Sequence, residues 1–315
     1  MIDEQVQAFL KDWEQAWSTL SPQSGPAERR AHFEVVAAGM REPDPAGLIT
    51  EEHYVDVPEQ EQVRVRVFRI SDAPLSAPAL VYMHGGAWMQ GSPETHWDIT
   101  AGIAAANAQV VISVDYALAP EKTFPLALNE CVAVMKWTRE KAGVLGIDPQ
   151  RIAIGGDSAG ANLAAAVCLA LRRSTHAPMA QLLVYPAVDM TRLDRDSHRE
   201  NANGPVIAVA GMSKVNAMYC PDVAAQSQAF VSPLMANSHS DLPDAFIAVA
   251  QYDPLRDEGL AYAKALTESG VAVELDRGEN LIHGYLRAKS YSAAARLSFD
   301  RMCAWLNQKN KLSVS

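Results

Sequence analysis

The chain lacks long apolar runs, an excess of basic residues and the layout of a signal peptide, which are typical of membrane, nucleic-acid-binding and secreted proteins respectively. None of its apolar runs approaches the roughly 18 residues of a membrane span. Basic residues are in the minority, with 27 Lys and Arg against 37 Asp and Glu, so the formal net charge is −10. Nucleic acids and anionic membranes attract basic clusters, and we therefore expect neither as a partner. The acidic first residues lack the layout of a signal peptide, which predicts a cytoplasmic protein.

Cysteine is also scarce. The four cysteines, at positions 131, 168, 220 and 303, are widely scattered, and the first two fall within helical patterns. This spacing favours buried thiols over disulfides.

The apolar content of 49% can form a large core. Residues 63–68 alternate between apolar and polar, as in an antiparallel strand with one wet face. Short apolar runs follow, and helical patterns separate most of them, which predicts an α/β fold with a mostly parallel sheet covered on both faces. The runs are 79–83, 110–114, 152–154, 182–185, 246–250 and 271–275, and the helical patterns are 101–106, 126–141, 158–172, 256–269 and 287–307.

Two segments interrupt this alternation. Residues 1–45 look helical and amphipathic and precede every strand. Residues 190–235 are long for a connection, charged at first and then partly helical, which is typical of a lid or cap. We expect apolar residues of both segments to fold over the site described next: Phe9, Trp13 and Trp17 from the first, and Val206, Ile207, Met212 and Met218 from the second.

The most informative stretch is GDSAG at residues 156–160, directly after a short apolar run and directly before an Ala- and Leu-rich helix. A sharp strand-to-helix turn of this kind exposes a nucleophilic serine, here Ser158, and leaves no room for large side chains beside it. Before it, Gly85 and Gly86 follow another strand. They form either a tight turn or, with the N–H of Ala159, the donors that stabilise an oxyanion.

A serine nucleophile needs a base and an acid. Only His283, among eight histidines, lies in a loop past the final strand; His84 is expected to be structural, and histidines 32, 53, 96, 176, 198 and 239 to be surface residues. Asp253 follows a strand end and either orients the histidine or caps the next helix. The order Ser158, Asp253, His283 is that of the α/β-hydrolase topology.

Six segments together resemble the hormone-sensitive-lipase-like esterases, in the bacterial branch with GDSAG at the nucleophile. They are 84–88 (HGGAW), 115–121 (DYALAPE), 124–125 (FP), 156–160 (GDSAG), 253–258 (DPLRDE) and 283–285 (HGY). The resemblance implies an eight-stranded α/β-hydrolase core at 46–189 and 236–315, with a helical cap at 1–45 and 190–235. It implies hydrolysis of short-chain carboxylic esters through an acyl-enzyme, without cofactor or metal, by proteins that often form homodimers. The substrate pocket is expected to include Trp88, Asp157, Val206, Ile207, Met212 and Ile282.

Two other functions remain open on the same scaffold. Amidases, including formamidases, use the same triad and oxyanion loop, so these motifs do not separate amides from esters. Catalytically dead homologues act as ligand-binding receptors, but they lose the serine or the histidine, and both are present here. A true lipase would carry a more apolar lid than the charged residues 191–200.

Overall fold

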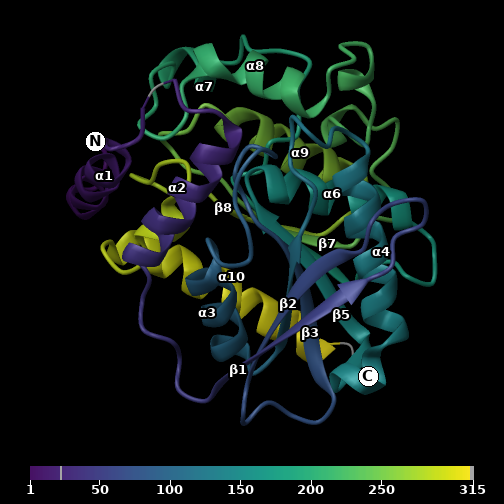
Figure 1. Cartoon of the computed structure of the whole chain (residues 1–315). Helices are drawn as coiled ribbons and strands as arrows, with labels where there is room; N and C mark the ends of the chain where they lie inside the picture. The colour runs from purple at the N-terminus through teal and green to yellow at the C-terminus, as the bar shows by residue number, and fades with distance from the viewer. Residues whose placement is uncertain (22, 313–315) are drawn as a thin grey trace.

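A computed structural model describes residues 1–21 and 23–312, and within these ranges eight strands form one sheet (Figure 1). The strand order is β1-β2-β4-β3-β5-β6-β7-β8. β2 pairs antiparallel with β1 and β4, and all other pairs are parallel, which confirms the α/β-hydrolase fold expected from the sequence. The strands are β1 (Leu48–Val55), β2 (Val63–Ile70), β3 (Ala77–Met83), β4 (Val110–Asp115), β5 (Ile147–Asp157), β6 (Ala180–Val184), β7 (Asp244–Ala248) and β8 (Val273–Asp276).

Helices cover both faces of the sheet, and for this reason the central strands are continuously apolar. Every residue of β3 and β6 is buried, as parallel strands between two helical layers require. α4, α5, α6 and α9 pack on one face, and α3 and α10 pack on the other. The helices of these layers are α3 (Trp97–Asn107), α4 (Leu126–Glu140), α5 (Ala142–Leu145), α6 (Ala159–Leu171), α9 (Arg256–Glu268) and α10 (Ala293–Leu312).

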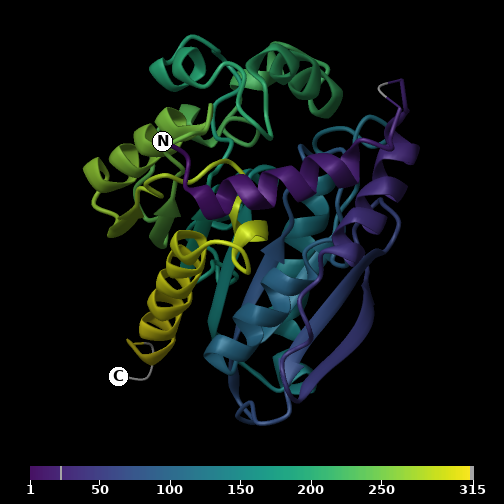
Figure 2. The ribbon, with the colours of Figure 1, turned by 90° about the vertical axis from the view of Figure 1, so that its left-hand side faces the viewer.

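The two segments that interrupt the alternation lie at one end of the molecule. In both views their helices lie toward the end opposite to the last turn of α10, while the coil that follows the second helix runs back along the side to the first strand (Figures 1 and 2). The first segment forms α1 (Glu4–Trp17) and α2 (Pro26–Gly39). The second forms α7 (Asp196–Glu200), α8 (Val209–Tyr219) and two short 3-10 turns, η1 (Ala225–Ser227) and η2 (Pro233–Met235).

The structure differs from the sequence prediction at two elements. β1 is an edge strand with a largely exposed, polar face, so it carries no apolar run to reveal it. The last helix begins at Ala293 rather than at 287. Gly284 adopts a φ of +76°, and a separate 3-10 turn, η3 (Tyr285–Ala288), follows it.

The remaining expectations from composition concern thiols and membranes. All four cysteines are buried and free, as expected. Over the described ranges, none of the helices has both the length and the apolarity needed to cross a bilayer.

Candidate active site

Ser158 occupies the turn that joins β5 to α6. Its φ of +55° and ψ of −119° lie in a region that non-glycine residues rarely adopt, which marks a strained, over-determined site. The turn packs against the end of β3: a Cβ atom on Gly156 or Gly160 would lie 2.4 or 2.0 Å from the carbonyl oxygen of Met83. The N–H of Ser158 donates to the carbonyl of Val184 at 2.9 Å, and this fixes the serine at the wall of a cavity.

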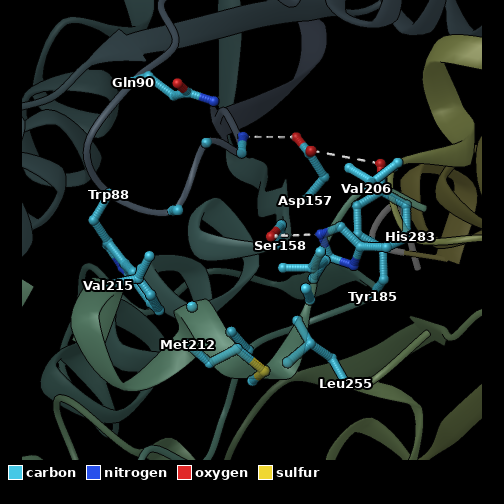
Figure 3. A pocket seen from close by; sticks show the side chains of 18 of the residues that line it. Trp88, Gln90, Asp157, Ser158, Tyr185, Val206, Met212, Val215, Leu255 and His283 are labelled. Atoms are coloured by element: carbon cyan, nitrogen blue, oxygen red, sulfur yellow. Dashed lines mark hydrogen bonds between the residues drawn. The ribbon is translucent and has the colours of Figure 1, made fainter. Parts of the chain in front are cut away.

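The structure brings Ser158, His283 and Asp253 together, although they come from three different loops; Figure 3 shows the first two. Nε2 of His283 lies 2.9 Å from Oγ of Ser158, and Nδ1 of His283 lies 2.8 Å from Oδ2 of Asp253. Both the histidine and the aspartate are buried. Since the carboxylate accepts the proton on Nδ1, Nε2 is left free to accept the serine proton. The three side chains can therefore generate a serine nucleophile.

Of its two expected roles, Asp253 takes the contact with the histidine and does not cap α9, whose N-cap is Leu255 without a side-chain cap bond. Its Oδ1 accepts the N–H of Leu255 at 2.8 Å, while Oδ2 contacts the histidine. The turn that Oδ1 stabilises leads into α9, which begins at Arg256. Asp257 binds elsewhere: it accepts the N–H of Ser197 at 2.7 Å and pairs with Arg256.

The loop after β3 requires a correction to the expected oxyanion donors. The N–H of Gly85 donates to Oδ1 of Asp157 at 3.0 Å, so this group is not free to bind a substrate oxygen. Within the described chain, the N–H groups of Gly86, Ala87 and Ala159 bond to no acceptor. Gly85 thus anchors the loop, and Ala87 offers a further free N–H group beside that of Gly86.

Asp157, next to the nucleophile, is a buried carboxylate with several partners. Besides Gly85, the hydroxyl of Tyr82 donates to it at 2.8 Å, and that of Tyr185 lies 3.5 Å away. Burial opposes ionisation, but the neighbouring His96 and Arg287 and the bond from Tyr82 hold the pKa of Asp157 below its usual range. Asp157 is therefore charged, and it serves to hold the loop after β3.

The histidines predicted to lie on the surface divide into two groups. Histidines 32, 53 and 176 are partly exposed. His96, His198 and His239 are instead buried, which corrects the prediction. Their polar sequence neighbours bond to other parts of the chain; for example, the carbonyl of Thr95 accepts from Arg287 at 2.8 Å.

A cavity of about 350 Å³ adjoins Ser158. Trp88, Asp157, Val206, Ile207 and Met212 line it as expected, together with Phe9 and Trp13 of α1. Phe33 of α2 also lines it, without having been predicted. The wall is mostly apolar, which suits a small organic ligand.

Three expected lining residues lie outside the cavity wall. Ile282 forms a bridge with Tyr252 in extended backbone, so its side chain points away from that of His283 and is fully buried in the core. Trp17 packs on Phe33, with ring centroids 5.7 Å apart, and Met218 packs against the core on the side of α4 and α6.

Comparisons with known proteins agree with this geometry. Residues 80–287 match the family described as alpha/beta hydrolase fold. The carboxylesterase NlhH of Mycobacterium tuberculosis is 37% identical over 265 residues, 83% of each chain, and an ethyl acetate hydrolase of Pseudomonas putida is 34% identical over 72% of each. The solved ester hydrolase EH1AB1 from the metagenome of Lake Arreo, in complex with a derivative of bipyridine phosphonate, superposes with a TM-score of 0.90 at 30% identity, over 98% of this chain and 99% of that one. The chain belongs to the alpha/beta hydrolase fold family, among its hormone-sensitive-lipase-like carboxylesterases.

Proposed function

We propose that this carboxylesterase hydrolyses esters of short-chain acids through an acyl-enzyme on Ser158. The observation that carries the proposal is the continuous chain of contacts from Ser158 Oγ to His283 to Asp253, at 2.9 and 2.8 Å, on the wall of a mostly apolar cavity. The sequence similarity to an ethyl acetate hydrolase supports a small ester as substrate.

In the first half of the reaction, Nε2 of His283 accepts the proton of Ser158 while Oγ attacks the ester carbonyl carbon. The negative charge that develops on the carbonyl oxygen is stabilised by the free N–H groups of Gly86, Ala87 and Ala159. Asp253 stabilises the imidazolium that forms. The ester C–O bond then breaks, and the alcohol leaves with the proton from His283.

In the second half, a water molecule replaces the alcohol. His283 removes a proton from this water, whose oxygen attacks the acyl carbon and forms a second oxyanion. Collapse of this intermediate releases the acid and returns the proton to Ser158. All the groups that act on the substrate are thus side chains and backbone N–H groups of the chain.

Residues 1–45 and 190–235 form the cap of this site in our proposal. Both segments contribute to the cavity wall, through Phe9 and Trp13 on one side and Val206 and Met212 on the other. A cavity of about 350 Å³ has limited depth. Each acyl methylene gains about 0.8 kcal/mol only while it finds apolar surface, so we expect kcat/KM to peak at about four to six acyl carbons and to fall about tenfold by twelve.

Three measurements test this function. An organophosphate should label the protein once, at Ser158, and Ser158→Ala should keep the fold while losing about 10⁴-fold or more in kcat. A series of p-nitrophenyl esters of rising acyl length, with one matching anilide, then defines the substrate. Labelling at another residue would refute the mechanism. Faster cleavage of the anilide would make the protein an amidase, and rising activity toward long-chain triglycerides would make it a lipase.

A further inference from the structure

Three ionisable side chains from distant parts of the sequence meet at the cavity wall beside the loop after β3, and the triad uses none of them. Asp157 ends β5, His96 precedes α3, and Arg287 lies in η3, four residues after His283. Nη2 of Arg287 lies 2.8 Å from Nε2 of His96, which in turn lies 3.5 Å from Oδ1 of Asp157. Nη1 of Arg287 donates to the carbonyl of Thr95 at 2.8 Å.

The charges of this cluster follow from its contacts. The guanidinium lies against the ring of His96, so a second proton on that ring would bring two cations together. Burial, and next the Arg287 cation, accordingly lower the pKa of His96. Arg287, which stays charged at every physiological pH, therefore supplies permanent positive charge that compensates the buried Asp157, beside the contact from His96. A buried charge without such compensation is strongly unfavourable.

Asp157 transmits this arrangement to the oxyanion donors. Its carboxylate accepts the N–H of Gly85 at 3.0 Å, and the next residue, Gly86, offers one of the free N–H groups. A hydrogen bond to an ionised acceptor is roughly twice as strong as one between neutral groups. The direction of the Gly86 N–H thus depends on Asp157 being charged and correctly placed.

The two N-terminal helices shield the cluster. The guanidinium carbon of Arg287 lies 4.7 Å from the ring centroid of Phe33 in α2 and 5.7 Å from that of Trp13 in α1. These aromatic rings cover one side of the half-buried cation and attract it electrostatically. In such surroundings the attraction between Arg287 and Asp157 is stronger than it would be in water.

We propose that Arg287 is a positioning residue for ester hydrolysis, which acts through Asp157 to hold the loop of Gly85 and Gly86 in the geometry that binds the oxyanion. The inference rests on the proposed function. The turn η3, which follows His283, would thus help to position the oxyanion donors relative to this histidine.

The first test is Arg287→Met, compared with Arg287→Lys. We expect the Met variant to lose about 10- to 100-fold in kcat with KM changed less than about threefold, because only the transition state uses the oxyanion donors. The Ki of a trifluoromethyl ketone, whose adduct places an oxyanion at the same donors, should rise by the same factor. The Lys variant keeps the charge and should retain most of kcat.

The matched control is Lys289→Met. Lys289 is a buried cation two residues further on, and it pairs with Glu42 at 2.6 Å rather than with Asp157. The Lys289→Met variant should leave kcat and the Ki of the trifluoromethyl ketone unchanged. Equal losses in both Met variants, or a change confined to KM, would refute the proposal.

The second test is a double-mutant cycle with Asp157→Asn. If Arg287 acts through the charge of Asp157, Arg287→Met should cost less than about threefold in kcat once that charge is gone. Additive losses would overturn the inference. So would an Arg287→Met variant that fails to fold beside a fully active Arg287→Lys, because the role would then be stability alone. Labelling of the wild-type enzyme at Ser158, together with its activity on esters, tests the proposed function separately, so that function can hold even if the role of Arg287 is refuted.

Discussion

Nδ1 of His283 lies 2.8 Å from Oδ2 of Asp253, and the other carboxylate oxygen accepts the backbone N–H of Leu255 at 2.8 Å. The carboxylate is thus held at both oxygens and cannot rotate away from the imidazole without breaking the second bond. One aspartate thus contacts both the proposed base and the turn that leads into α9. This places a strict requirement on the side chain at position 253.

Asp253→Asn should therefore reduce kcat by about 10⁴-fold, because an amide favours the wrong imidazole tautomer. Asp257→Asn is the matched control in the first turn of the same helix, where it bonds to Ser197 and Arg256 instead. It should leave kcat within about threefold and lower stability by about 1 kcal/mol. Steady-state kinetics and urea unfolding measure both effects, and equal losses of kcat would show that the acid is wrongly assigned.

Gly85→Ala should lower kcat by about 10²-fold with little change in KM. The added Cβ would lie 2.4 Å from Oδ2 of Asp157, so the loop or the carboxylate must move, and the oxyanion donors with it. Gly143→Ala in α5, where the Cβ would meet nothing within 4 Å, is the control. If kcat in the Gly85 variant matches the wild type, the loop does not depend on this contact.

Acidification should destabilise the protein through His84. Burial, and then the neighbouring His96, lower the pKa of His84 to about 3. The unfolded chain, with a pKa near 6.5, therefore binds the proton first, and stability is complete above about pH 6.5 and falls toward pH 3. Between pH 7.5 and 5 this one group should cost about 2 kcal/mol. The variant His84→Asn retains a donor for the carbonyl of Gly85. Its free energy of unfolding, measured in urea, should change by about 2 kcal/mol less than that of the wild type between pH 7.5 and 5. The same pH dependence in both proteins would show that His84 is not responsible.

Met212→Ala should move the acyl-length optimum by about two to three carbons toward longer chains. Met212 projects into the cavity from α8 (Figure 3), and each further methylene that finds room gains about 0.8 kcal/mol, or about fourfold in kcat/KM. Met218→Ala, on the same helix but packed against the core, should leave the optimum in place. A shift in both variants would indicate a general loosening of the cap.

The sequence predicted most of the sheet because buried parallel strands carry their own signal. β3, β4 and β6 are short, continuously buried apolar runs, and the sequence predicts each of them. β1 was missed because half of its residues face water at the sheet edge, and Glu51 and Glu52 hide its periodicity. A sequence pattern reveals a strand through its buried apolar residues, so a strand with few buried residues is not predicted.

The triad was predictable because each of its residues stands in a local motif. The surroundings of Asp157 were not, because His96 and Arg287 come from segments 61 residues before and 130 residues after it, and no local pattern links them. Gly85 was assigned to the substrate for the same reason: its partner is the carboxylate of Asp157, from another strand end. Ile282 was misplaced because adjacent residues of an extended chain face opposite ways.

The amino end of the chain is tied to the segment that carries the base. The N–H of Asp3 donates to the carbonyl of Asn280 at 3.1 Å, three residues before His283, and Oδ1 of Asp3 accepts the hydroxyl of Ser292 at 3.2 Å. The last turn of α10 lies at the other end of the molecule from α7 and α8 (Figure 2). For immobilisation on a solid support, or for fusion to another protein, we expect a linker at the carboxyl end to leave His283 undisturbed, whereas a linker at the amino end strains the contacts of Asp3 with Asn280 and Ser292.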